Sequence, residues 1–167
     1  MLIDLTLIQK NEGGSLPVSC KVALSSQTYF GQEYVFTTPL EVNGKITNLG
    51  SELELRATAK GTFQTYCDRC LREISVSCEF PVMERLMRAD TGASEEEAYL
   101  YDGHEIDLDD IVLKNFLLNT SSKYLCSADC KGLCPKCGKD LNEGACQCSS
   151  EEFDPRFAAL SEWKEEK

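Results

Sequence analysis

Apolar and polar residues alternate along much of the first half of the chain, and this period of two predicts β-strands. The clearest run spans residues 53–59, where leucine and alanine alternate with glutamate, arginine and threonine before the chain reaches Gly61. A second run spans residues 74–80 and is followed by Pro81, which we expect to close that strand. Half-buried strands of this kind pair antiparallel, so the pattern predicts a mainly antiparallel β-sheet, which could curl toward a barrel.

The dipeptide Asn43-Gly44 is the strongest hairpin signal in the chain. It lies between two strand-forming segments, and Asn-Gly favours the type I′ turn. Residues 1–8 predict a further strand. Cys20 and Cys78 stand alone on apolar strand faces, where we interpret them as small core residues.

One long helix is predicted after the strands. Asp107 can cap its N-terminus, and Asp109 and Asp110 suit its first turn because carboxylates are favourable at the positive end of the helix dipole. We expect the helix to continue to about Asn119. Its inner side, which we expect to pack on the core rather than to bind a partner, consists of Leu108, Ile111, Val112, Asn115, Phe116 and Leu118.

An acidic segment leads into this helix. Residues 90–110 carry nine Asp or Glu and no Lys or Arg, so we interpret them as a mobile crossing or lid. His104, the only histidine, lies within it and is expected to be solvated. Near the C-terminal end, Asp154-Pro155 predicts the start of a short helix with the apolar residues Phe157, Leu160 and Trp163.

Paired cysteines carry the strongest chemical signal. Six of the ten cysteines lie between residues 126 and 148, and Cys134-Pro-Lys-Cys137-Gly138 has the form of a metal knuckle. Eight cysteines form four closely spaced pairs, which predict two Cys₄ zinc sites in a ribbon-like module. The first site would use Cys67, Cys70, Cys126 and Cys130, and the second Cys134, Cys137, Cys146 and Cys148.

Two other metal arrangements are open to the C-terminal cysteines. Cys146 and Cys148 would face the same side of a regular strand, so a single site from Cys130, Cys134, Cys137 and Cys148 is an alternative. The spacing Cys130-x₃-Cys134-x₂-Cys137 also matches the iron–sulfur site of radical S-adenosylmethionine enzymes. A short, β-rich chain lacks the large α/β barrel that holds that cofactor, which disfavours this interpretation.

Catalysis is not predicted. Cys67-x-x-Cys70 could be a thioredoxin-type redox pair, but such a pair opens a helix after a strand, whereas the residues that follow here are strand-like. The chain also has no Gly-rich phosphate loop, nucleophile elbow or histidine pair. We therefore expect a protein that is not an enzyme.

The amino-acid composition indicates a globular protein that does not span a membrane with helices. Of the 167 residues, 42% are hydrophobic, enough for a core, yet no apolar run approaches the ~18 residues of a membrane span. Ten cysteines without an export signal favour a reducing compartment and metal binding, so we expect a soluble, cytoplasmic protein. We divide it into a β-rich domain with the acidic loop and helix, residues 1–124, and a zinc-binding module with the short C-terminal helix, residues 125–167.

The charge is distributed unevenly. A net charge of −11 argues against non-specific nucleic-acid binding, but residues 114–139 carry five Lys and one Asp. These cations could contact RNA, or they could balance the charge of metal-bound thiolates. The candidates for RNA contact are Lys131, Lys136, Lys139, Arg69 and Arg72.

Several of these motifs, in their order and spacing, resemble the YceD family from about residue 60 to residue 160. The resemblance rests on Cys67-Asp-Arg-Cys70-Leu71, Glu105-Ile-Asp-Leu108, Asp-Cys-Lys-Gly-Leu-Cys-Pro-Lys-Cys-Gly at residues 129–138, Leu141-Asn-Glu-Gly144 and Asp154-Pro-Arg-Phe157. It implies a non-catalytic cytosolic factor in the synthesis, processing or stability of 23S ribosomal RNA. Its expected partners are ribosomal RNA or ribosome-assembly proteins, not a small-molecule substrate.

Two alternative functions fit the same sequence. The acidic segment at residues 90–110 could make the protein an adaptor for a basic ribosomal protein or processing enzyme. The thiolates could also make it a zinc- or redox-responsive regulator.

Overall fold

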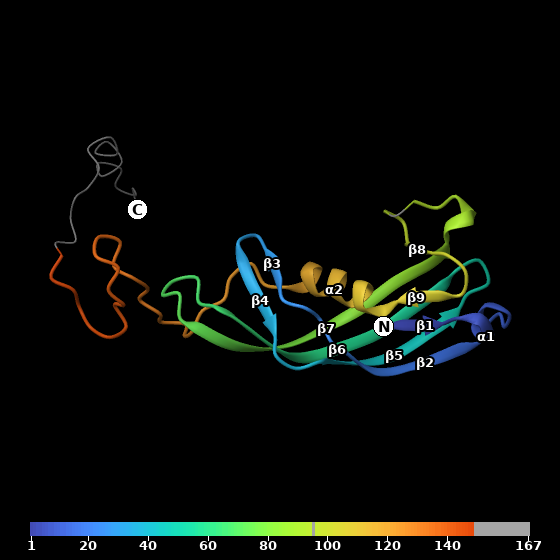
Figure 1. Ribbon diagram of the computed structural model, residues 1–167, viewed down its shortest axis with the longest axis horizontal. Helices are drawn as coiled ribbons and strands as arrows, with labels where there is room; N and C mark the ends of the chain where they lie inside the picture. The colour runs from blue at the N-terminus through green and yellow to red at the C-terminus, as the bar shows by residue number, and fades with distance from the viewer. Residues whose placement is uncertain (95, 149–167) are drawn as a thin grey trace, which may run out of the picture.

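The fold is one long, twisted antiparallel sheet with a helix against one face, and the cysteine-rich segment projects from one end (Figure 1). The computed structural model describes residues 1–94 and 96–148, so the predicted C-terminal helix lies outside the described residues. The elements are β1 Leu2–Asp4, α1 Thr6–Gln9, β2 Ser15–Val22, β3 Gln27–Tyr29, β4 Gln32–Phe36, β5 Leu40–Asn48, β6 Leu53–Tyr66, β7 Glu73–Arg88, η1 Ala89–Thr91, β8 Tyr99–Tyr101, β9 Glu105–Asp107 and α2 Leu108–Asn119.

Strand β6 is the centre of the sheet. Its whole length pairs with β7 on one side, while the other side pairs first with β5 and then with β4. Strand β2 extends the sheet beyond β5, and all these pairings are antiparallel, as predicted. Within residues 1–94 and 96–148, β2 does not pair with β7, so the sheet does not close into a barrel.

The predicted hairpin turn at Asn43-Gly44 is wrong, because β5 runs through both residues without interruption. Gly44 lies in register with Val18 on β2 and Ala57 on β6. A Cβ atom at Gly44 would lie 2.2 Å from the backbone oxygen of Arg56. Glycine is therefore required here for close approach of two strands and not for a turn.

The strand ends predicted at Gly61 and Pro81 are also wrong, since β6 and β7 continue past them. At Gly61, the side chain of Leu40 occupies the position that a Cβ would take. At Pro81, the missing N–H breaks no ladder bond. The N–H of Met83 donates to Asn115 Oδ1 at 3.3 Å, so it points away from β6. Residues two apart in a strand point the same way, so the nitrogen of Pro81 also points away from β6.

Helix α2 covers the core face of the sheet. It begins and ends where predicted, with the Asp107 carboxylate accepting from Asp109 N at 3.0 Å, and its 12 residues make it a helix of ordinary length. The ring of Phe116 packs edge-on against aromatic rings of the sheet, which include Phe63 at a centroid distance of 5.3 Å. Leu118, predicted to face inward, is 73% exposed, because its turn of the helix already presents Phe116 and Leu117 to the core.

Cys20 and Cys78 are half-buried and pack against the core, as expected. Their burial raises the pKa of both thiols. Neither cysteine belongs to the two groups of cysteines described below.

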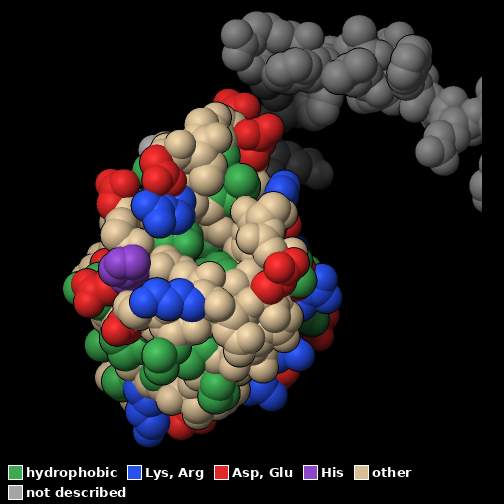
Figure 2. All heavy atoms as spheres, turned by 90° about the vertical axis from the view of Figure 1, so that its right-hand side faces the viewer, with side chains coloured by type: hydrophobic (Ala, Val, Ile, Leu, Met, Phe, Trp, Pro, Cys, Tyr) green, Lys and Arg blue, Asp and Glu red, His purple; other side chains and the backbone are tan. Residues whose placement is uncertain are grey.

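Parts of the acidic segment are paired with the rest of the fold. Strand β8 runs parallel to the end of β7, and β9 pairs antiparallel with β1, which occupies only part of the strand predicted at residues 1–8. His104 is exposed, and its Nδ1 lies 2.6 Å from Gln9 Oε1. Figure 2 shows this end of the molecule, where acidic and basic side chains are interspersed. No helix in the described part of the chain is long and apolar enough to cross a membrane.

We predict that Gly44→Ala destabilises the protein by about 3 kcal/mol or more, because the added methyl group overlaps the backbone of β6. Chemical denaturation measures the effect. Gly13→Ala is the matched control: Gly13 has a φ of +76° but open space around it, so its substitution should cost only about 1 kcal/mol of backbone strain. Equal losses in the two variants would contradict the close approach at Gly44.

Candidate metal centres

The connection between β6 and β7 forms the first cysteine knuckle. The N–H of Cys67 donates to Arg72 O at 2.8 Å, and the N–H of Leu71 donates to Cys67 O at 2.9 Å. Leu71 has a φ of +58°, a conformation that ordinarily favours glycine. This tight turn holds Cys67 and Cys70 together at the end of the sheet, where both side chains are buried.

A second pair of cysteines reaches this knuckle from the segment after α2. Asp68 and Tyr124 join the two: Asp68 N donates to Tyr124 O at 2.9 Å, and Tyr124 N donates to the Asp68 carboxylate. This contact brings Sγ of Cys130 to 3.8 Å from that of Cys67, and Sγ of Cys126 to 3.6 Å from that of Cys70. The four sulfurs lie within 4.8 Å of one another, and we call this group the first centre.

The second centre consists of Cys134, Cys137, Cys146 and Cys148, whose sulfurs also lie within 4.8 Å of one another. Its knuckle repeats the geometry of the first. Gly138, with a φ of +73°, donates its N–H to Cys134 O at 2.9 Å. Cys146 and Cys148 do not lie on a regular strand, so both sulfurs can approach one point.

The structure thus gathers the eight cysteines into the two sets that their spacing predicted. The alternative set of Cys130, Cys134, Cys137 and Cys148 is divided, because Cys130 belongs to the first centre. The centres differ in exposure. Three of the four cysteines in the first are buried, whereas in the second Cys137 is exposed and only Cys134 is buried.

The sulfurs of each centre cannot all ionise unaided. Burial raises the pKa of Cys67, but backbone N–H groups outweigh it and lower the pKa to about 6. Backbone N–H groups likewise lower the pKa of Cys134 to about 6. In contrast, the neighbouring Cys137 sulfur raises the pKa of Cys148 to about 12. Four thiolates this close together therefore require a cation among them, and each centre could hold a metal ion.

Asn142 is not among the site residues predicted from the sequence, but it contacts a cysteine of the first centre. Its Nδ2 lies 3.5 Å from Cys130 Sγ, and its Oδ1 accepts from Lys131 N at 2.8 Å. Asn142 lies in the loop between the two cysteine pairs of the second centre, so one loop serves both centres. Only the spacing Asp140-x-Asn142, typical of a turn in which side chains bond the backbone, hints at this role from sequence.

The two centres are also joined through the backbone. Leu133 and Asp140 form an isolated β-bridge, and Leu141 N donates to Gly132 O at 2.9 Å. Gly132 has a φ of +74°, and a Cβ there would lie 2.9 Å from Arg69 O. The link between the centres therefore passes directly over the first knuckle.

The basic residues predicted to contact RNA lie around these centres, and several already contact the protein. Arg69 Nη1 donates to Cys130 O at 2.7 Å, and Arg72 forms an ion pair with Asp140 at 3.2 Å. Lys139 Nζ donates to Ala145 O at 3.0 Å. Lys131 and Lys136 are exposed beside the first and second knuckles.

Comparison with known proteins identifies relatives. A family model described as "Large ribosomal RNA subunit accumulation protein YceD" matches residues 55–164, which include all eight clustered cysteines. The chain is 34% identical over 62 residues to "Large ribosomal RNA subunit accumulation protein YCED homolog 1, chloroplastic" of Arabidopsis thaliana, a match covering 37% of this chain and 19% of that protein. It is 24% identical over 141 residues to "Uncharacterized protein YlbN" of Bacillus subtilis (strain 168), covering 83% and 82% of the two chains. No solved structure matches.

We predict that Asn142→Ala lowers the metal affinity of the first centre by about 10- to 100-fold, because supports of this kind orient the ligand they contact. Asn142→Asp should also weaken it, since a carboxylate can still accept from Lys131 N but offers no N–H to Cys130. The measurement is chelator competition, with alkylation of the released thiols to identify which centre empties. Asn43→Ala, on the solvent face of β5, is the control. Equal affinity in Asn142→Ala and Asn43→Ala would contradict a supporting role.

Proposed function

We propose that this chain, which belongs to the YceD family, is a non-catalytic zinc-binding factor in biogenesis of the large ribosomal subunit. It would act in the synthesis, processing or stability of 23S ribosomal RNA in the cytoplasm. Its partners would be ribosomal RNA or ribosome-assembly proteins. The description of the family, and the name of the Arabidopsis relative, refer to accumulation of this RNA and to no chemical reaction.

The observation that carries the proposal is the pair of four-cysteine centres inside the region that the family model matches. Four thiolates with sulfurs in mutual contact suit zinc, which prefers tetrahedral sulfur coordination. A full set of four protein ligands leaves no open position for a substrate or an activated water, so we assign zinc a structural role.

RNA contact through the cysteine module is the second part of the proposal. Lys131, Lys136 and Lys139 flank the cysteines, and Lys131 and Lys136 are exposed. Arg69 and Arg72 would act mainly as supports of the centres, because both bond the protein itself. A basic patch on an acidic protein favours contact with one kind of site over non-specific binding along RNA.

We predict about two zinc ions per chain in the purified protein, measured by elemental mass spectrometry. Cys67→Ser and Cys134→Ser should each remove about one of them. Cys78→Ser should remove none, because Cys78 packs against the core away from both centres. One zinc per wild-type chain would contradict two centres, and a brown protein with visible absorption would indicate an iron–sulfur cluster instead.

Chelation of the same sample tests the proposed division into residues 1–124 and 125–167. Residues 125–148 contain only three large apolar residues, Leu125, Leu133 and Leu141, too few to order them without metal. Hydrogen exchange should therefore show loss of protection there while β2, β5, β6 and β7 stay protected. Cooperative unfolding of the whole chain would mean that the metals hold the sheet together as well.

We predict that replacing Lys131, Lys136 and Lys139 together by Glu weakens binding to a 23S ribosomal RNA fragment without loss of zinc. Three phosphate contacts give a salt slope of about −2 to −3, which the variant should flatten by a similar amount. The control variant has the same change in charge on the solvent face of the sheet, where Glu replaces Lys21, Lys45 and Lys60. Equal weakening in both variants would indicate a net-charge effect. Normal binding by the first would favour the acidic segment as a protein adaptor.

A further inference from the structure

An unusual aromatic residue stands at the tip of the β3–β4 hairpin. Phe30 and Gly31 form its two-residue turn with φ values of +49° and +77°, a geometry that ordinarily selects Asn-Gly. Phe30 thus has a strained backbone, and its side chain is 93% exposed and contributes nothing to the core. Packing of the core therefore does not explain a phenylalanine at this position.

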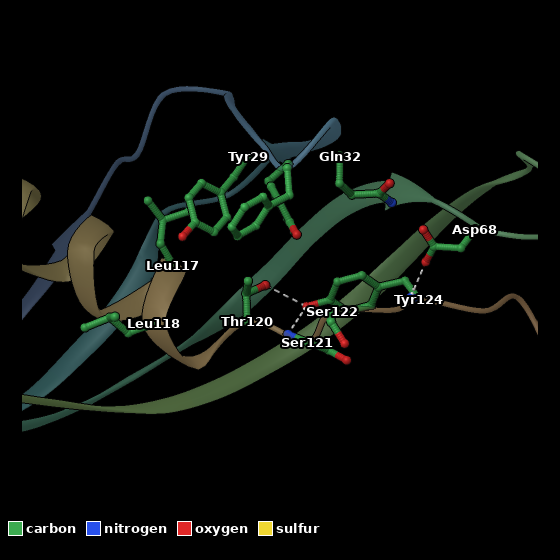
Figure 3. A pocket seen from close by; sticks show the side chains of 11 residues that line it. Tyr29, Gln32, Asp68, Leu117, Leu118, Thr120, Ser121, Ser122 and Tyr124 are labelled. Carbon is green, nitrogen blue, oxygen red and sulfur yellow. Dashed lines mark hydrogen bonds between the residues drawn. The ribbon is translucent and has the colours of Figure 1, made fainter.

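Phe30 is one of the residues that line a pocket of about 390 Å³. The pocket lies between the hairpin and the C-terminal end of α2 (Figure 3). The ring of Tyr29 stands 4.4 Å from that of Phe30, measured between centroids. Tyr124 lines the pocket from the segment after the helix, with its hydroxyl group 2.8 Å from Thr120 Oγ1. The pocket therefore presents aromatic side chains from two separate parts of the chain, and its volume lies within the range of small-ligand sites.

Two side-chain oxygens in the pocket offer hydrogen-bond acceptors. Gln32 uses both N–H groups of its amide within the protein, toward Thr65 Oγ1 at 2.8 Å and Tyr66 O at 2.6 Å. Asp68 accepts from Tyr124 N through one carboxylate oxygen. Gln32 Oε1 and Asp68 Oδ1 have no hydrogen-bond partner within residues 1–94 and 96–148. The pocket thus combines aromatic faces with unpaired acceptors.

We propose that this pocket binds an unpaired base of single-stranded RNA, and that it favours a base with an exocyclic amino group, such as cytosine, over uracil. The inference rests on the proposed function and adds to it the site that receives a base. Exposed aromatic rings are the surfaces on which unpaired bases stack, and a carboxylate accepts from the N4 amino group of cytosine. An aliphatic peptide side chain would use the apolar surface but would leave both acceptors without a donor, whereas the amino group of a base can pair with one of them.

The position of the pocket agrees with an RNA strand that continues onto the cysteine module. Asp68 lies within the first knuckle, and exposed Lys123 directly precedes Tyr124. A base bound in the pocket would place its phosphates near Lys123, and the RNA strand would continue from there toward the basic residues of the module. Metal at the first centre would also keep Asp68 in place for the base.

The test measures binding of zinc-loaded protein to cytidine and uridine decamers by fluorescence anisotropy. Wild type should bind the cytidine decamer about fivefold more tightly, the effect of about one hydrogen bond. Phe30→Ala should weaken both decamers by roughly 5- to 100-fold, as loss of one stacked base does, while Phe30→Tyr should bind normally. Asp68→Asn should abolish or reverse the preference, because its amide can still accept from Tyr124 N while offering N–H to uracil O4.

The control is Leu7→Ala, which replaces an exposed apolar residue of α1, far from the β3–β4 hairpin (Figure 1). Normal binding by Phe30→Leu would indicate an aliphatic protein contact and would overturn the base site. Displacement by cytidine monophosphate at equal concentration would indicate a free-nucleotide pocket and overturn it as well. If Phe30→Ala binds normally while the variant with Glu at positions 131, 136 and 139 is weakened, the pocket proposal is wrong but the proposed RNA contact through these lysines stands. If wild type binds neither the decamers nor the ribosomal RNA fragment, the proposed RNA contact fails first.

Discussion

The hydrogen bonds between Asp68 and Tyr124 join parts of the chain that are 56 residues apart, and much of the structure depends on them. Asp68 belongs to the turn between β6 and β7, and Tyr124 follows α2. With this contact in place, Cys126 and Cys130 approach Cys67 and Cys70, and the first centre is complete. The same contact aligns Tyr124 opposite the β3–β4 hairpin and so completes the aromatic pocket. One long-range contact therefore connects the helix, the knuckle and the pocket to the end of the sheet.

The sequence was most informative where a short-range rule determines the structure. Cysteine spacing predicted both groups of sulfurs, and the cap at Asp107 predicted where α2 begins. The sequence was misleading where one residue type suits two structures. Glycine at position 44 suits either a turn or a close approach of two strands, and only the neighbouring backbone of β6 determines which one forms. Pro81 is acceptable in β7 because its nitrogen points away from β6, which periodicity alone does not reveal.

Two features of the candidate sites, the aromatic pocket and the contact of Asn142, could not be predicted from sequence motifs. The aromatic pocket combines residues near position 30 with residues near position 120, and neither group forms a motif. Asn142 supports a sulfur 12 residues before it, from a loop whose length alone gives no indication of the contact. The aromatic pocket follows from the topology of the sheet and from the face of the sheet that α2 covers, and both depend on long-range packing.

The shared loop of the two centres has a consequence for how they respond to scarce metal. Asn142 is held between Cys137 and Cys146, so an ordered second centre keeps its amide beside Cys130 of the first. Metal at one centre would therefore raise the affinity of the other, and thermodynamic linkage would make the effect reciprocal. The more exposed second centre would release its ion first, and that loss would lower the metal affinity of the more buried first centre. Loss of metal would therefore begin at the second centre and spread to the first over a narrower range of free metal concentration than two independent centres would show.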